Sequence, residues 1–195
     1  MTTVRFYLAE FMIVMVPPAV AFWFVAHPLV AIWRRIGPGV TYSLLITMAI
    51  LLGWVCFLGR GVLVGEDLGT HSAPIILGLV LYFSSIALEL QIRKQLPLKT
   101  FVGFTELAPD RVDAKLLCEG IYRRVRHPKY ASAFLGILGF ALFTNYSGAL
   151  VMGVLNLPAL YLVTVLEERE LVDRFGEAYR QYQADVPRLL PRLFS

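Results

Sequence analysis

The feature that most limits what this chain can fold into is a series of five apolar stretches, separated by short polar segments and by one long polar segment before the last two. Four stretches are long enough, or nearly so, to cross about 30 Å of hydrocarbon as a helix: residues 6–26, 40–58, 74–92 and 149–166. The fifth, residues 131–144, is shorter and is followed by Asn145-Tyr146-Ser147-Gly148, a plausible tight turn. We therefore expect an all-α polytopic membrane protein with about five transmembrane helices, the last two forming a helical hairpin.

The composition agrees with a membrane protein. Of the 195 residues, 57% are hydrophobic and only 16% are charged, and the mean hydropathy is +0.66, which is too apolar for an ordinary soluble domain. The first apolar stretch could also be a signal peptide, because Ala19-Val20-Ala21 resembles a cleavage site. However, that stretch contains Glu10 and continues past the alanines, which favours a membrane helix.

The basic residues are divided unevenly between the two sides of the expected bundle. If all five helices cross the membrane, 16 of the 18 Lys and Arg residues lie on one side, and only Arg5 and Arg60 lie on the other. The positive-inside rule makes the basic side cytoplasmic, so we expect the N-terminus outside and the C-terminus in the cytoplasm of an inner or plasma membrane. The net charge of +4 is explained by topology and anionic headgroups, without a nucleic-acid partner.

Polar groups are concentrated in the second half of the chain. Residues 1–92 read as a three-helix scaffold, and residues 93–195 as a cytoplasmic segment, the hairpin and a charged tail that together form one folded unit. Apolar residues recur at helical spacing in the tail, which predicts an amphipathic cytoplasmic helix: Leu171, Phe175, Tyr179, Tyr182 and Val186. The two cysteines lack the spacing of metal ligands, so we expect no metal site.

Two polar clusters bracket the hairpin. The first precedes it and comprises Gly120, Tyr122, Arg126, His127, Pro128 and Tyr130. The second follows it and comprises Glu167 and Glu168. Because a helical hairpin returns the chain to the side that it left, both clusters can meet at the cytoplasmic interface.

Each cluster also has a simpler interpretation. The first is compatible with an interfacial belt, in which Arg reaches the headgroups, Tyr marks their level and Pro starts a helix. The two glutamates could be a solvated continuation of the last helix at a wet interface. Adjacent acids beside anionic headgroups gain little from the lipid, however, and a cationic ligand would explain them.

The pattern G-x-Y-x-x-x-R-H-P-x-Y, an apolar hairpin and a second pattern beginning E-E resemble a known family. The second pattern continues through Leu171, Phe175, Gly176, Tyr179, Tyr182, Val186, Pro187, Arg188 and Pro191. Together they are similar to the isoprenylcysteine carboxyl methyltransferase group and the related bacterial phospholipid methyltransferase-like proteins. The resemblance covers about residues 115–195, whereas residues 1–90 resemble the family only in being helical and apolar.

The resemblance implies a membrane enzyme that binds S-adenosylmethionine at the cytoplasmic end of the bundle. The expected contacts are Glu167 and Glu168 with the ammonium or ribose hydroxyls, Arg126 and His127 with the carboxylate, and Tyr122 and Tyr130 with adenine. We expect Gly120 and Pro128 to shape the same site. Arg126, His127 and Glu168 are the expected catalytic residues, and His127 is a candidate base for a thiol acceptor.

One position departs from the family pattern. Many relatives have a histidine six residues before the first glycine, where this chain has Ala114, followed by Lys115. Any role of that histidine in cofactor binding is therefore missing here or passes to Lys115. We also expect residues 103–111, with Glu106 as the main polar contact, to sense the acceptor or to be an ordinary loop.

Two other functions remain open from the sequence alone. Sterol-reductase-like enzymes have a similar C-terminal architecture but use NADPH, and a non-enzymatic protein of this fold could bind lipid or a partner. A pocket open to the bilayer would suit several lipophilic acceptors, among them a prenylated cysteine carboxylate, a phospholipid amine, a thiol and an isoprenoid. We infer the bilayer and such an acceptor as partners, and no obligatory protein partner.

Overall fold

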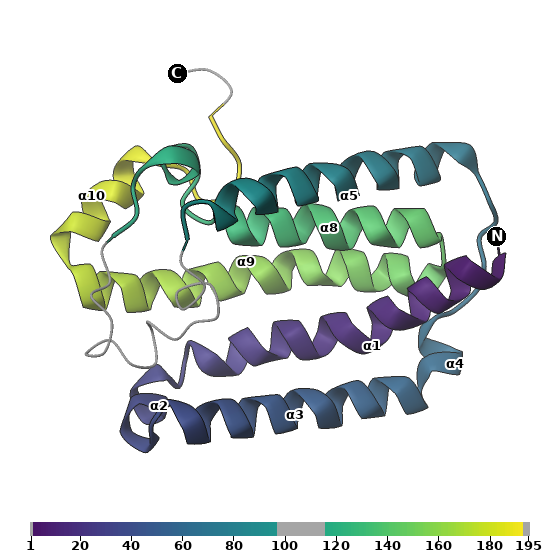
Figure 1. The fold of residues 1–195 in the computed structure, drawn as a ribbon, viewed down its shortest axis with the longest axis horizontal. Helices are drawn as coiled ribbons and strands as arrows, with labels where there is room; N and C mark the ends of the chain where they lie inside the picture. The colour runs from purple at the N-terminus through teal and green to yellow at the C-terminus, as the bar shows by residue number, and fades with distance from the viewer. Residues whose placement is uncertain (1, 97–115, 193–195) are drawn as a thin grey trace.

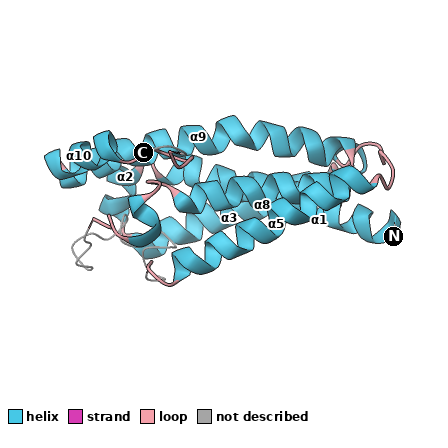
Figure 2. Cartoon of the chain, turned by 90° about the horizontal axis from the view of Figure 1, so that it is seen from above, coloured by secondary structure: helices cyan, strands magenta, loops and turns pink. Residues whose placement is uncertain are grey.

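Five long helices lie side by side in the computed structural model, which describes residues 2–96 and 116–192 (Figures 1 and 2). The elements are α1 (Thr2–Ala26), α2 (Val30–Ile36), α3 (Pro38–Leu58), α4 (Arg60–Leu63), α5 (Ser72–Arg93), the 3-10 turn η2 (Gly120–Arg123), α8 (Pro128–Thr144), α9 (Ser147–Phe175) and α10 (Glu177–Asp185). Helices α1, α3, α5 and α9 are long and apolar enough to span a membrane, and α8 is a shorter apolar helix. The expected all-α polytopic membrane fold is confirmed.

Helices α8 and α9 form the predicted hairpin. Asn145 ends α8 in the left-handed conformation, with φ of 52°, and α9 begins two residues later. Helix α8 has 17 residues, about 26 Å at 1.5 Å per residue, whereas α9 has 29 residues, about 44 Å. Since a hydrocarbon core is about 30 Å thick, the last turns of α9 extend beyond it, and Glu167 and Glu168 lie where α9 leaves the apolar layer.

Close backbone contact joins α5 to α8. A Cβ atom at Gly139 of α8 would lie 2.7 Å from the carbonyl oxygen of Gly78 and 2.7 Å from the amide nitrogen of Tyr82, both on α5. Ser132 of α8 donates a hydrogen bond to the carbonyl oxygen of Ser85, 3.0 Å away. Small residues allow helices to approach this closely in a membrane, where packing and hydrogen bonds replace the hydrophobic effect between helices.

The end of the bundle that holds the N-terminus is tied together by Arg5. Its side chain is buried, forms an ion pair with Asp67 and donates a 2.9 Å hydrogen bond to the carbonyl oxygen of Thr144. At the same end Arg60 forms a 2.9 Å ion pair with Glu10. The two basic residues on the sparsely charged side are therefore each neutralised by an acid, which reduces the cost of placing them there.

The tail differs from the single amphipathic helix that its spacing predicts. Helix α9 continues through Phe175, the chain turns at Gly176 with φ of 59°, and α10 follows. A positive φ favours glycine because it has no Cβ. Beyond this turn Tyr179, Tyr182 and Val186 are buried and pack against Leu171 and other residues near the end of α9, so the predicted inward-facing surface is present on two helices.

We predict that Gly139→Ala destabilises the protein by about 1 to 3 kcal/mol, because the added methyl group overlaps backbone atoms of α5 that cannot move independently. Gly39→Ala on α3 is the matched control, since nothing lies within 4 Å of the Cβ that it would add. Unfolding of the purified variants in detergent measures both effects. Equal stability of the two variants would contradict the close packing of α5 against α8.

Candidate functional site

The segment before α8 pairs with the segment after α10. The backbone N–H groups of Arg126 and His127 donate to the carbonyl oxygens of Pro187 and Arg188, at 2.9 and 3.0 Å. Val186 is extended, as expected for a residue before proline, and Pro128 occupies the first turn of α8, where its missing N–H costs nothing. The two hairpin clusters and the C-terminal segment therefore meet at one end of the bundle (Figure 1).

Glu168 lies at the centre of this end. Its carboxylate accepts hydrogen bonds from Arg126 Nε at 2.9 Å and from Arg188 Nη2 at 2.6 Å. Gln183 of α10 adds a hydrogen bond of 3.1 Å to the same carboxylate. The residue is 4% exposed, and its charge is balanced by two guanidinium groups, as a buried carboxylate requires.

His127 lies between two carboxylates. Its Nε2 atom is 3.0 Å from Glu168 Oε1, and its Nδ1 atom is 3.4 Å from Glu167 Oε2. Burial lowers the pKa of His127, but the adjacent carboxylates of Glu167 and Glu168 outweigh it and raise the pKa above its ordinary value. The two carboxylates thus favour the protonated ring, in which neither nitrogen can accept a proton.

Two buried polar atoms beside this network lack a hydrogen-bond partner among the described residues. They are Oε2 of Glu167, which is at ion-pair distance from His127 but makes no hydrogen bond, and the hydroxyl of Tyr179. Buried polar atoms are nearly always hydrogen-bonded in native proteins. A carboxylate oxygen without a donor therefore indicates a place for a ligand that carries hydrogen-bond donors or positive charge.

The turn η2 borders the same network. Gly120 begins it with φ of 58°, and a Cβ there would overlap the side chain of Gln95 at the end of α5. The hydroxyl of Tyr182 donates a hydrogen bond to the carbonyl oxygen of Tyr122. Burial raises the pKa of Tyr122, and the negative charges of Glu167 and Glu89 act in the same direction, so its phenol stays neutral and able to donate.

Tyr130 is directed toward a second buried cluster. Its hydroxyl lies 3.3 Å from His27 Nε2, and His27 Nδ1 lies 3.4 Å from Glu170 Oε2. Arg34 of α2 donates a 2.7 Å hydrogen bond to the other oxygen of Glu170. The rings of Tyr130 and His127 are in edge contact, with centroids 5.8 Å apart, so the two clusters are neighbours.

The structure brings together Arg126, His127, Glu167 and Glu168, with Gly120 and Tyr122 at the border, and places Tyr130 between the two clusters. Sequence reasoning missed Arg188 and Gln183 as members of the network, although Arg188 belongs to the V-P-R motif at its end. It also missed His27 and Arg34, because residues 1–92 showed no motif. Ala114, Lys115 and residues 103–111 with Glu106 lie outside the described residues.

The alternative interpretation of the two glutamates as a solvated continuation of the last helix is wrong for Glu168. His127 and Glu168 are each 4% exposed, because α10 and the C-terminal segment cover them. A simple headgroup belt would leave such side chains in contact with water or lipid headgroups. Their burial in a mutually satisfied network shows that they are part of the folded core at this end.

The fold and this cluster together define a polytopic helical membrane protein with a buried, charged site at one end of its bundle. Residues 73–178, more than half of the chain, match the phospholipid methyltransferase family. The chain belongs to this family. The matched region runs from α5 through α8 and α9 to the start of α10, and so contains both hairpin clusters.

Individual relatives match over shorter regions. The chain is 37% identical over 82 residues to methanethiol S-methyltransferase of Pseudomonas deceptionensis, covering 42% of this chain and 30% of the relative. It is 32% identical over 99 residues to methanethiol S-methyltransferase 2 of Bradyrhizobium diazoefficiens, covering 50% and 36%. It is 35% identical over 80 residues to protein-S-isoprenylcysteine O-methyltransferase of Schizosaccharomyces pombe, covering 40% and 34%. The matches span only about a third of these relatives. No solved structure matches the chain.

We predict that Glu168→Gln destabilises the protein by about 3 kcal/mol, because it leaves the Arg126 guanidinium buried without its counter-ion. Glu89→Gln is the matched control: it removes an ion pair of similar length, 2.9 Å, in which Arg93 is 66% exposed, and should cost less than about 1 kcal/mol. Unfolding in detergent compares the two variants. A Glu168→Gln effect as small as that of Glu89→Gln would show that the network is not structural.

Proposed function

We propose that this protein is an S-adenosylmethionine-dependent methyltransferase that modifies a lipophilic acceptor. The observation that carries the proposal is the buried Oε2 of Glu167, which lies 3.4 Å from His127 Nδ1 and makes no hydrogen bond among the described residues. Family membership supports methyl transfer, and the relatives named above are methyltransferases by name. Among known methyl donors, S-adenosylmethionine presents the combination of ammonium, carboxylate and hydroxyl groups that this site can bind.

The residues fit this donor. Glu167 can accept a hydrogen bond from an ammonium or a ribose hydroxyl, because its Oε2 accepts none from the residues that the structure describes. Arg126 and His127 would attract the donor's carboxylate, and Tyr122, as a neutral phenol, offers an aromatic face and a hydroxyl to the adenosine. Glu168 holds Arg126, His127 and Arg188 in place, so we assign it a positioning role in addition to its charge.

When bound, S-adenosylmethionine supplies an activated methyl group for in-line transfer. The protein's contribution is to bind donor and acceptor in one closed site and to exclude water. Helix α10 and the segment after it cover Glu168 and its partners, which provides such a closure. Because His127 is favoured as a cation between Glu167 and Glu168, we assign it to donor binding and not to proton removal from the acceptor.

We further propose that this end of the bundle faces the cytoplasm. In the described residues Arg5 and Arg60 lie at the opposite end, each with an acidic partner, and the other basic residues lie toward the site. This distribution supports the orientation through the positive-inside rule. It also places the site where a cytoplasmic methyl donor could reach it.

We predict that Glu167→Gln weakens binding of S-adenosylhomocysteine by about 5- to 150-fold, equivalent to about 1 to 3 kcal/mol for one lost charged contact. The substitution keeps the side chain's size and leaves the Glu168 network intact, so the stability of the unliganded protein should change little. Calorimetric titration of the purified protein measures the affinity, with Glu89→Gln as the control. Wild-type affinity in Glu167→Gln would contradict the proposed donor site.

A further inference from the structure

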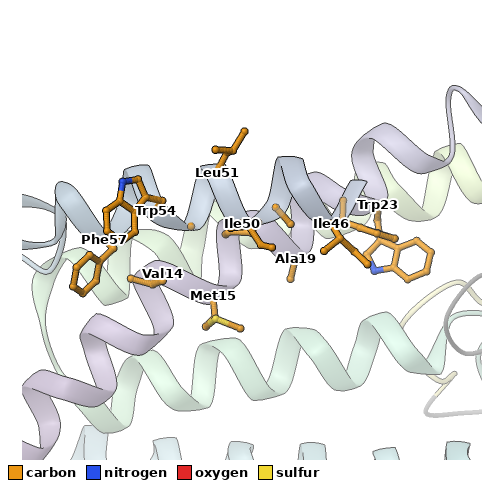
Figure 3. A pocket seen from close by; sticks show the side chains of 13 residues that line it. Val14, Met15, Ala19, Trp23, Ile46, Ile50, Leu51, Trp54 and Phe57 are labelled. Carbon is orange, nitrogen blue, oxygen red and sulfur yellow. The ribbon is translucent and has the colours of Figure 1, made fainter. Parts of the chain in front are cut away.

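A groove of about 770 Å³ runs between α1 and α3 and is open along one side. Its lining extends from Val14 to Trp23 on α1 and from Ile46 to Phe57 on α3, and every lining residue is apolar. Trp23 and Phe57 lie at its opposite ends (Figure 3). Gly53 lies close to the backbone of Val14, since a Cβ there would be 3.4 Å from the Val14 carbonyl oxygen, and the small side chains of Ala19 and Ala49 leave space in the groove.

The groove ends beside the proposed site. The Trp23 ring stacks on His27, with centroids 5.5 Å apart, and Lys129 Nζ lies 4.0 Å from the centroid of the Trp23 ring. Lys129 directly precedes Tyr130, whose hydroxyl contacts His27 and whose ring contacts His127. A hydrocarbon chain lying in the groove would therefore bring its end to Trp23 and Lys129. From there only the side chain of Tyr130 separates it from His127 of the proposed donor site.

His27 has the arrangement of an oriented base. In its neutral form one tautomer satisfies both contacts: Nδ1–H donates to Glu170 Oε2 at 3.4 Å, and Nε2 accepts from the Tyr130 hydroxyl at 3.3 Å. A carboxylate that holds one ring nitrogen as a donor makes the other nitrogen the proton acceptor of the ring. His127 cannot fill this role because carboxylates face both of its nitrogens.

We propose that the groove holds the hydrocarbon chain of a long-chain thiol, and that His27 takes the thiol's proton as its sulfur is methylated. This inference rests on the proposed methyltransferase function. The S–H bond breaks and its proton moves to His27 Nε2, in place of the contact with Tyr130. The thiolate's electron pair forms the new bond to the methyl carbon, while the pair of the donor's carbon–sulfur bond remains on the donor's sulfur.

The charge of the site favours an acceptor that is negative as it reacts, and an oriented base favours a thiol, because a carboxylate needs none. Lys129 at the end of the groove favours a group that becomes negative, such as a thiolate, over an amine that must carry positive charge. The bilayer is as apolar as the groove, so the groove gains little by hydrophobic burial. Its contribution is to orient the chain and hold its end beside Trp23, which raises the effective concentration of the reacting atom.

Comparing a short thiol with a long one tests whether the groove binds the acceptor's hydrocarbon chain. Purified protein in lipid nanodiscs is assayed with the methyl donor and either ethanethiol or dodecanethiol. Ala19→Trp fills the groove and should lower kcat/KM for dodecanethiol by at least about tenfold, with ethanethiol changed less than about twofold. Ala87→Trp, at an exposed position of α5, is the control and should leave both substrates unaffected.

Equal effects of Ala19→Trp on both thiols, or no effect on either, would overturn the groove assignment. Methylation of phosphatidylethanolamine or of a prenylated cysteine carboxylate in place of both thiols would overturn the acceptor class. Binding of S-adenosylhomocysteine is measured in parallel on every variant. Its absence from the wild-type protein would refute the proposed function itself, which distinguishes that failure from a wrong acceptor.

The proton-accepting role is tested by His27→Gln. The variant should lose at least about tenfold in dodecanethiol turnover near pH 7. It should recover toward wild type only as the pH rises above about 10, because an alkanethiol is less acidic than the cysteine side chain, whose pKa is about 8.5. The variant keeps all the charged and titratable groups around His27 and its contacts: Glu170, Tyr130, Arg34, Lys129 and Glu167. Unchanged affinity for S-adenosylhomocysteine would show an intact donor site, and a loss that persists at high pH would overturn the role of His27.

Discussion

The rest of the site depends on the ion pairs that the Glu168 carboxylate forms. This carboxylate binds Arg126 and His127 from the segment before α8, and Arg188 from the segment after α10. Two segments that are far apart in sequence are thereby held near the end of α9. Both oxygens of Glu168 accept hydrogen bonds, whereas Oε2 of the neighbouring Glu167 accepts none within the described part of the chain. One glutamate of the pair thus organises the site, and the other is available to a ligand.

The lengths of two helices place this contact at the membrane surface. Helix α8 is shorter than α9 by twelve residues, so α9 continues past the level at which α8 begins and carries Glu167, Glu168 and Glu170 out of the apolar layer. At the other end of the bundle, ion pairs of Arg5 with Asp67 and of Arg60 with Glu10 compensate the charges there. Among the described residues, the bundle therefore has one end with two basic residues, each paired with an acid, and one end at which the other basic residues gather.

Sequence periodicity was sufficient to predict the five helices, the hairpin and the meeting of its two clusters, because apolar length and short connections leave few alternatives in a membrane. The turn at Gly176 was not predicted, since the apolar spacing continues across it while the backbone reverses. The burial of His127 and Glu168 also escaped prediction, because it arises from contacts with α10 and Arg188 across the folded structure. The cluster of His27, Arg34 and Glu170 joins residues more than 130 positions apart, and no local pattern reveals it.

The most direct test of this account is an experimental structure of the protein with S-adenosylhomocysteine bound. The account predicts a donor group of the ligand within about 3 Å of Glu167 Oε2, with Glu168 still bound to Arg126 and Arg188. It also predicts that the ligand's sulfur faces the corner formed by Tyr130, His27 and Trp23. A ligand bound elsewhere in the bundle, or one that displaces Arg126 and Arg188 from Glu168 while leaving Glu167 without a partner, would contradict it.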